Sequence, residues 1–424
     1  RYMASRNIRL ITAATAALWM VAAPIWVAEA EVEVQPQPLT WEACLAEAAE
    51  QHPDMISARE QIRQAEAEAA IAYGGFYPRL GADASATLRE EPETSYSAGL
   101  SASLMLFDGF GTLGSAQAAD ATVRQARARL DQAAADTRYT LRAAFVNLLK
   151  TQELISLTEI IANRRRQNLD LVRLRYQAGR EHEGSLKTAE AELAQAAFEV
   201  GQARRALRLG HVRLAEALGR EPGEALTVAG ALSVSDTAET PDFTAMIKTL
   251  PAVREAKAEE DAAEARLRSS YGAWYPELKL GASAGLQGDA LPMDSDAWSA
   301  GMSLSWPIFS GGSRAAGVRK AEASLARSRE SLRSARTAQR VALEDAWNTR
   351  LDARGQLGVR AKYLAAAEDR AKIANGQYSA GLIAFDDWTI IEDNLVNARK
   401  NHLNARAQAL LAEAQWLQAE GGGF

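Results

Sequence analysis

The chain has 424 residues, 47% of them hydrophobic and 24% charged, and its net charge at pH 7 is −6. This acidic balance argues against nucleic acid as a partner, because nucleic-acid binding requires a basic surface. Cys44 is the only cysteine, so no disulfide can form within the chain.

The first residues have the pattern of a secretory signal peptide, which we expect to cover residues 1–30. Met3 is followed by two arginines, by an apolar run from Leu10 to Val27, and by Ala28-Glu29-Ala30. A transmembrane anchor is the alternative, but the short run and its small-x-small ending favour cleavage after Ala30. No later stretch reaches the ~18 apolar residues of a spanning helix, so any membrane insertion is expected to use strands.

Helices are predicted ahead of an alternating region. The sequence predicts a short helix capped by Thr40 and a longer one that restarts at Pro53. Strands follow at about 79–89 and 96–107, each with one apolar face and one face of small polar residues. A half-buried hairpin of a soluble protein would alternate in the same way. Aromatic residues near the strand ends favour strands of a lipid-facing barrel instead.

A very long helix is predicted after the second strand. Apolar residues recur every seven positions towards Tyr176, which indicates a supercoiled helix packed against neighbours. At ~1.5 Å per residue, ~65 residues make a rod of about 100 Å. We expect the rod to end at a tip at 176–184, with Gly179 ending it and Ser185 capping the return helix.

Most of this sequence occurs twice. The region from strand to tip matches residues 202 positions later, and Tyr73–Leu80 matches Tyr271–Leu278 at an offset of 198. Constant offsets over such a length indicate an internal duplication. We therefore divide the chain into a first structural repeat at 31–220, a linker at 221–241 and a second repeat at 242–424.

The second repeat predicts the same elements as the first. Strands are expected at about 277–287 and 297–309, and a tip at 378–386. Gly381 is expected to end the outgoing helix, and Asp386 to cap the returning one.

No catalytic constellation emerges from the sequence. Residues Gly109 to Gly114 match a GxGxxG motif, but the preceding strand alternates and no βαβ unit follows, so these glycines are expected to turn a strand into a helix. The four histidines lack metal-binding spacing. We expect no enzyme activity, cofactor or metal site. Acidic residues near the tips form a candidate cluster: Glu181, Glu183, Asp386, Asp387, Glu392 and Asp393.

The sequence resembles the TolC-like outer-membrane factor (outer membrane efflux protein) family. The resemblance lies in LTWEACLAEAAEQHP from Leu39, the YPxL strand starts, the F-(D/S)-G strand ends and Tyr-x-x-Gly at both tips. It implies a mostly α-helical protomer with a transmembrane β-barrel portion, which gives four strands and long coiled-coil-like helices to a trimeric channel-tunnel. The location implied is the outer membrane of a Gram-negative bacterium, with a long periplasmic portion. Four strands alone cannot close a barrel of ~8 or more, whereas three chains supply twelve.

The resemblance also implies roles for the two tips, which in this family close the channel and dock a periplasmic adaptor. The implied adaptor-docking residues are Ala178, Gly179, Arg180, Ala380, Gly381 and Leu382. The implied periplasmic gate residues are Asp387, Asp386, Tyr378, Tyr176 and Ser185. Ile383 and Ile390 replace a gating arginine and a second acidic ring of the family's archetype, so a ring of Asp387 is the main gate element carried over.

The expected function is therefore the exit duct of a tripartite efflux pump or a type I secretion system. Its expected partners are two further copies of the chain, a periplasmic adaptor, an inner-membrane transporter reached indirectly, and outer-membrane lipid. The alternative is a secreted periplasmic or extracellular coiled-coil protein with a structural or adhesive role.

Overall fold

The computed structural model describes residues 38–87, 95–221, 223, 226–233 and 240–424. The expected signal peptide and part of the expected linker lie outside these described residues.

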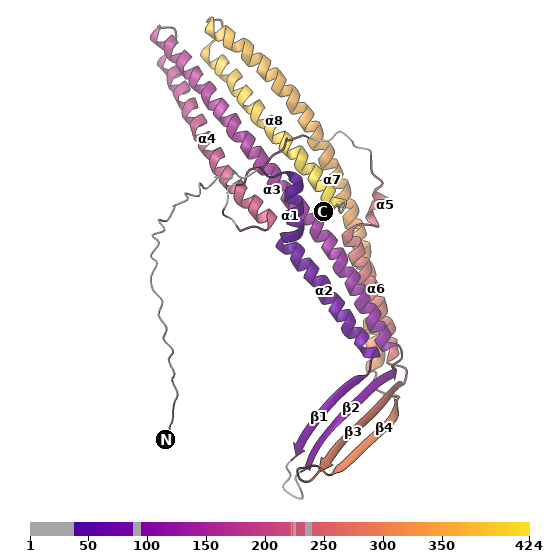
Figure 1. The fold of residues 1–424 in the computed structure, drawn as a ribbon. Helices are drawn as coiled ribbons and strands as arrows, with labels where there is room; N and C mark the ends of the chain where they lie inside the picture. Colours follow the sequence, from indigo (N-terminus) through magenta and orange to yellow (C-terminus); the bar gives the residue numbers. More distant parts are fainter. Residues whose placement is uncertain (1–37, 88–94, 222, 224–225, 234–239) are drawn as a thin grey trace, which may run out of the picture. The chain divides into compact units, whose positions relative to one another are not determined.

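Each half of the chain places short helices before a β-hairpin and a long helical hairpin after it (Figure 1). The first half contains α1 (Trp41–Gln51), α2 (Pro53–Tyr73), the 3-10 turn η1 (Gly74–Phe76), β1 (Arg79–Thr87), β2 (Ser95–Phe107), α3 (Gly111–Gln177) and α4 (Glu183–Leu218). The second half contains α5 (Phe243–Ile247), α6 (Pro251–Gly272), β3 (Glu277–Gly288), β4 (Ser295–Ser305), α7 (Ser313–Ser379) and α8 (Phe385–Ala419).

The strands of the described residues form one antiparallel sheet in the order β1-β2-β3-β4. We expected β4 to continue to residue 309, but it ends at Ser305. Pro307 explains the difference, because proline cannot donate a hydrogen bond to a strand ladder and restricts the residue before it.

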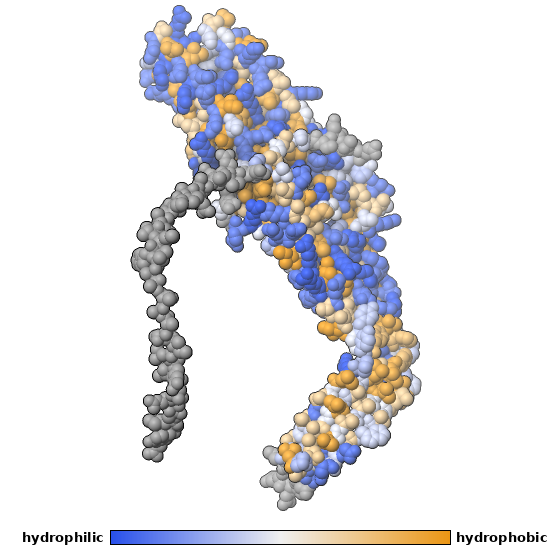
Figure 2. All heavy atoms as spheres, in the orientation of Figure 1, coloured by the Kyte–Doolittle hydropathy of each residue, from blue (hydrophilic) through white to orange (hydrophobic). Residues whose placement is uncertain are grey.

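Both faces of the sheet are open to solvent in the single chain. The leucines of its apolar face are exposed, with Leu80 at 81% and Leu100 at 66%. The opposite face carries serines, of which Ser85 and Ser97 lie 2.9 Å apart at their Oγ atoms. Apolar and pale residues predominate on the visible side of the sheet in Figure 2, whereas the helices show many hydrophilic residues, drawn in blue. The sheet therefore has no hydrophobic core of its own.

The helices pack side by side as a layer of rods. Helix α3 contacts α4 and α2 on one side and α8 and α6 on the other, and α7 packs beyond α8 and α6. The shorter helices meet end to end, because the chain turns at Gly219 next to Pro53, and at Gly421 next to Pro251. Both glycines have a positive φ, 79° and 74°, which a side chain would make unfavourable.

The long helices are held together largely by small residues. Alanines make up much of the buried surface of α3, α4, α6 and α8, so the helix backbones approach closely. Larger residues form separate hydrophobic clusters along the helices. One of them surrounds Leu141, Phe145 and Leu148 of α3 and also buries Cys44. Burial raises the pKa of the Cys44 thiol to about 11.

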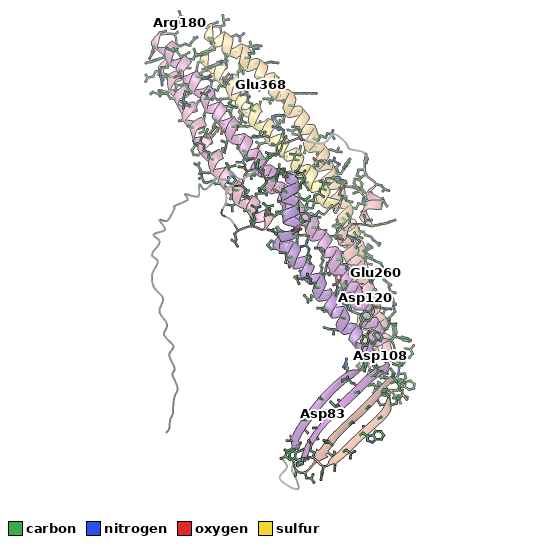
Figure 3. All side chains as sticks on the ribbon, viewed as in Figure 1. Asp83, Asp108, Asp120, Arg180, Glu260 and Glu368 are labelled. Atoms are coloured by element: carbon green, nitrogen blue, oxygen red, sulfur yellow. The ribbon has the colours of Figure 1, made fainter. Side chains whose placement is uncertain are left out.

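The glycines of the GxGxxG motif turn a strand into a helix, as predicted, and they also serve this packing. Gly109 has a φ of +66°, and a Cβ on Gly114 would come within 2.7 Å of Ser269 in α6. Asp108, labelled in Figure 3, stabilises the start of α3 because its Oδ2 accepts a 2.6 Å hydrogen bond from the Thr112 N–H. The motif thus turns β2 into α3 and brings α3 close to α6.

Candidate functional site

Each helical hairpin ends in a tight turn closed by a glycine. Gly179 and Gly381 have φ angles of +69° and +78°, as expected for residues that end a helix. The next residues, Arg180 and Leu382, donate backbone hydrogen bonds of 2.9 and 2.8 Å back to Arg175 and Gln377. All the implied docking residues are exposed, and Arg180 stands at the tip in Figure 3.

The predicted caps of the return helices are wrong. Helix α4 is capped by His182, whose Nδ1 accepts a 3.1 Å hydrogen bond from the Ser185 N–H. Helix α8 is preceded by Ala384, which gives no side-chain cap, and Asp386 lies within its first turn. Both helices begin earlier than expected because the closing turn at each glycine is short. Ser185 is instead buried and donates to Glu181 Oε1 at 2.9 Å.

The two equivalent tyrosines have different surroundings. Tyr378 is fully buried, and its ring stacks on Trp388 with centroids 4.2 Å apart and planes 8° apart. The Arg175 guanidinium lies 4.5 Å from the centre of the same ring. Tyr176, in contrast, is 40% exposed. Although both tyrosines were predicted at the gate, only Tyr378 lies in the packed interior of the tips.

Tyr378 also links the two helical hairpins. Its hydroxyl donates a 2.9 Å hydrogen bond to Glu181 Oε2, and burial together with this bond raises the pKa of Tyr378. Arg175 donates to the Tyr378 carbonyl at 2.6 Å, and its Nε lies 3.8 Å from Glu181 Oε2. We call Arg175, Glu181 and Tyr378 the inter-hairpin latch, because the first two lie on the α3–α4 hairpin and the third lies on α7.

Further from the tips, ion pairs join α3 to α8. Arg164 donates to both carboxylate oxygens of Glu392 at 2.5 and 2.7 Å, and Glu392 is 1% exposed. Arg165 is paired with Glu192 at 2.9 Å and also with Asp393. The structure therefore does not gather the predicted acidic residues into one cluster, because Glu392 and Asp393 are paired with separate arginines of α3.

Asp386 and Asp387 differ from these paired carboxylates. Both are exposed in the first turn of α8, where the helix dipole favours negative charge. Among the described residues, neither side chain has a hydrogen bond or ion pair. Of the neighbouring residues, Ile383 packs against the hydrophobic cluster around Tyr378 and Trp388, whereas Ile390 is 59% exposed.

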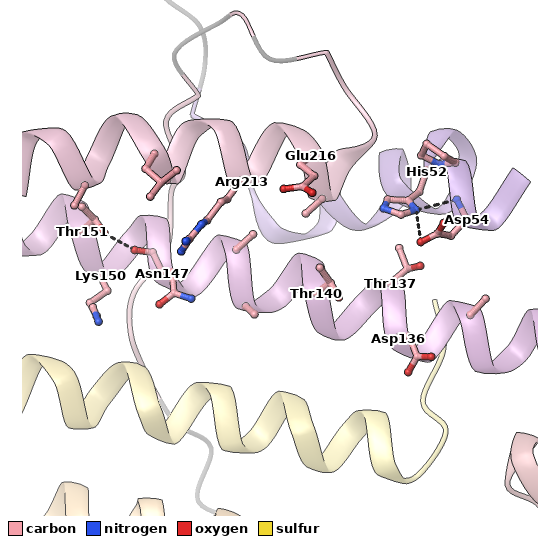
Figure 4. A pocket seen from close by; sticks show the side chains of 18 of the residues that line it. His52, Asp54, Asp136, Thr137, Thr140, Asn147, Lys150, Thr151, Arg213 and Glu216 are labelled. Atoms are coloured by element: carbon pink, nitrogen blue, oxygen red, sulfur yellow. Dashed lines mark hydrogen bonds and ion pairs between the residues drawn. The ribbon is translucent and has the colours of Figure 1, made fainter. Parts of the chain in front are cut away.

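The described residues offer little for catalysis or metal binding. They contain no group of three or more His, Cys, Asp or Glu side chains that could hold a metal ion. A groove of about 930 Å³ lies between α2, α3 and α4, but its lining mixes small apolar side chains with scattered charges, and no reactive pair converges there (Figure 4).

None of the described helices combines the length and the apolar composition that crossing a membrane requires.

Comparison with known proteins agrees with this architecture. The model of the family described as "Outer membrane efflux protein" matches residues 44–220 and 246–422, one match in each repeat. The duplicated fold and these matches define a channel subunit of the outer membrane. The chain belongs to the outer membrane efflux protein family.

Individual relatives are distant in sequence but similar in fold. The outer membrane efflux protein BepC of Brucella suis biovar 1 is 24% identical over 337 residues, which cover 78% of this chain and 74% of BepC. The structure of CusC has a TM-score of 0.83 at 17% identity and covers 90% of this chain and 92% of its own. The open-state structure of the Neisseria gonorrhoeae channel MtrE has a TM-score of 0.81 at 20% identity, with coverages of 90% and 88%.

The protein is an outer-membrane efflux channel with a periplasmic helical tunnel, and it is not an enzyme. The predicted family, fold class, channel function and location are confirmed, and the secreted scaffold is set aside. TolC-like channels are trimeric. Sequence reasoning missed Arg175 and Trp388 as tip residues, because only the packing of the two hairpins brings them against Tyr378.

Proposed function

We propose that three copies of the chain close into one tunnel that is the exit duct of a tripartite efflux pump or a type I secretion system. The observation that carries this proposal is the incompleteness of the single chain. Strands β1 and β4 are the sheet edges, and within the described residues neither has a neighbour on its outer side. Three chains would supply twelve strands, enough for a barrel with an open lumen.

The side chains of the sheet support this arrangement. Its apolar side chains, including Leu80 and Trp298 at 81% and 79% exposure, have no packing partner in the chain and suit contact with outer-membrane lipid. The serines of the opposite face would line the lumen. In the proposed barrel, the apolar face of the sheet contacts lipid and the serine face contacts water in the lumen.

The charges on α7 and α2 also favour a closed ring of three copies. Residues 313–340 of α7 carry eight basic and two acidic side chains, whereas α2 carries four acidic and two basic ones. The two helices lie on opposite edges of the helical layer, so ring closure would bring α7 of one copy against α2 of the next. Complementary charge of this kind directs association and disfavours wrong pairings.

We assign gating to the inter-hairpin latch and to Asp387. Opening the periplasmic end requires α7 and α8 to move away from α3 and α4, which would break the bonds of Tyr378 to Glu181 and Arg175. A three-fold axis would gather three copies of Asp387, with Asp386 and the tip residues Tyr176 and Ser185 nearby, into a ring that attracts cations. The alternative is that Asp387 only stabilises the start of α8, through the attraction between its negative charge and the helix dipole.

The exposed tips are the proposed docking surface for a periplasmic adaptor, which would connect the duct indirectly to an inner-membrane transporter. The two turns present short backbone loops at Gly179 and Gly381, flanked by Arg180 and by Leu382, which is 74% exposed. An exposed leucine beside a glycine turn suits insertion into an apolar groove of a partner.

Light scattering on the detergent-extracted protein tests the assembly. We expect the mass of three chains, and a stable, folded monomer would contradict the proposal. Deletion of the gene then tests the pump assignment. Increased sensitivity to drugs or metals, or the loss of a secreted protein, is expected, and which of these appears identifies the cargo.

A further inference from the structure

A small polar cavity lies between α1, α3, α8 and the C-terminal tail. Its volume is about 270 Å³, just below the roughly 300–1,000 Å³ that is typical of pockets for drug-sized ligands. The side chains that define its chemistry are half-buried or buried: Trp41, Arg138, Tyr139, Arg142, Leu410 and Glu413. The cavity therefore has room for a ligand of a few heavy atoms, and its lining includes charged groups that can bind one.

Arg142 of α3 lies in this cavity with its hydrogen-bond donors unused. Its guanidinium is 4.6 Å from the centre of the Trp41 ring and 6.0 Å from that of Phe145, so aromatic side chains fix its position. Among the described residues, its side chain forms no hydrogen bond or ion pair. Burial lowers the pKa of Arg142. A half-buried guanidinium without acceptors is unfavourable, and an anionic ligand would supply them.

Glu413 of α8 brings the opposite charge to the same cavity. Within the described part of the chain, its carboxylate also has no hydrogen bond or ion pair, although its negative charge acts on Arg142 and partly offsets the effect of burial on the Arg142 pKa. The two charges thus line one cavity without being paired. The internal duplication does not account for them, because the residues 202 positions away are Glu344 and His211.

We propose that this cavity binds a small zwitterion of the amino-acid class, with its carboxylate on Arg142 and its ammonium group on Glu413. A planar guanidinium suits a carboxylate because it can donate two parallel hydrogen bonds to it. An ammonium group has only donors, and the Glu413 carboxylate provides acceptors. The walls formed by Leu410, Ala414 and Leu417 suit a short apolar side chain of the ligand.

Arg138 makes a carboxylate on the ligand necessary. Its Nη1 donates a 2.7 Å hydrogen bond to the Gly423 carbonyl oxygen, which holds the Arg138 side chain beside the C-terminal tail. With Arg142 it gives the cavity two guanidiniums against the one carboxylate of Glu413. A cation without a carboxylate is therefore repelled.

The cavity lies within one chain, and neighbouring copies in the proposed ring would not cover it. Helices α3 and α8 are the inner pair of the helical layer, whereas α7 lies at one edge and α4 or α2 at the other. Binding to this cavity therefore does not require assembly, and the inference goes beyond the proposed duct.

Isothermal titration calorimetry on the detergent-extracted full chain tests the site with leucine and two of its analogues. Isocaproate is leucine without the ammonium group, and isoamylamine is leucine without the carboxylate. We expect leucine to bind with a Kd of about 1 mM or tighter, and each analogue at least about tenfold more weakly, because each loses a charge-assisted hydrogen bond.

Glu413→Gln provides a readout that a purely structural role would not give. Loss of the negative charge should weaken leucine binding about tenfold, because the ammonium group loses its charged acceptor. The same change should strengthen isocaproate binding, because the glutamine amide no longer repels the carboxylate of the ligand.

Substitutions of Arg142 test the other half of the site. Arg142→Gln should abolish the binding of leucine, whereas Arg166→Gln, at an exposed position of the same helix, should leave it unchanged. Because Arg142→Gln also removes the contact with Trp41, Arg142→Lys serves as a second variant. Lysine keeps a positive charge near the ring but cannot donate two parallel hydrogen bonds, so leucine binding should still weaken.

The outcomes separate this inference from the proposed function. A parent protein that does not bind leucine overturns the inference, as does leucine binding that is unchanged in both Arg142 variants. Equal affinities for leucine and isocaproate overturn the role of Glu413 and the zwitterionic class of the ligand. None of these results affects the proposed duct, which light scattering and conductance test separately.

Discussion

Removing one hydroxyl from the inter-hairpin latch should make the channel easier to open. Tyr378→Phe keeps the stacking on Trp388 and deletes the 2.9 Å hydrogen bond to Glu181. A hydrogen bond to a charged group contributes about 1.5–3 kcal/mol. Glu181 retains its bond from Ser185 and its proximity to Arg175, so the lower end applies. About 1.5 kcal/mol corresponds to a roughly tenfold larger open-to-closed ratio for each latch, of which a three-chain channel has three.

Recordings of single channels in planar bilayers measure this ratio directly. Tyr363→Phe is the matched control, because Tyr363 lies on α7 like Tyr378 and is 64% exposed. We expect open probability to rise for Tyr378→Phe and to stay near the parent value for Tyr363→Phe. Equal open probabilities in all three proteins would refute the assignment of the latch.

Three further outcomes are expected. If three copies of Asp387 form a ring in the channel, Asp387→Asn should weaken the block of conductance by divalent or trivalent cations in planar bilayers. An unchanged block would mean that Asp387 only interacts with the dipole of α8. Gly219→Ala and Gly179→Ala should both lower the free energy of unfolding by about 1–2 kcal/mol, because alanine is strained in the left-handed conformation of either glycine. Gly219→Ala should lower it further, because of these two positions only Gly219 would bring a Cβ against a neighbour, the Gln51 carbonyl oxygen at 2.9 Å. Equal losses for the two variants in denaturant titrations would contradict this. Burial lowers the pKa of His211 below its ordinary 6.5, so the folded state favours neutral imidazole, and stability is lost as pH falls through 6.5 towards the lower folded-state pKa. The thermal midpoint of the parent should therefore fall relative to His211→Gln between about pH 7.5 and about pH 5, and parallel curves would exclude the effect.

The sequence predicted the repeating elements well because local patterns determine them. Alternation of leucine with serine or glycine marks strands, and the constant offsets carry each assignment from one repeat to the other. Gly179 and Gly381 were correctly placed at helix ends, since few other residues adopt a positive φ there. Pro307 also signals the early end of β4, although the alternation around it suggested a longer strand.

The tip contacts could not be predicted in the same way, because they depend on how two hairpins pack. Tyr176 and Tyr378 occupy identical motifs, yet only Tyr378 meets Trp388, Glu181 and Arg175. Likewise Glu392 follows Asp387 closely in sequence, but its partner Arg164 lies on α3 in the other repeat. Pairings over such separations leave no periodic signal in a single sequence.

Conductance of the purified protein in planar bilayers tests the central claim most directly. If three copies form an efflux duct, insertion of the detergent-extracted trimer should produce discrete, stable conductance steps. A folded trimer that inserts into the bilayer but never conducts ions, even with Tyr378→Phe to release the latch, would contradict the account.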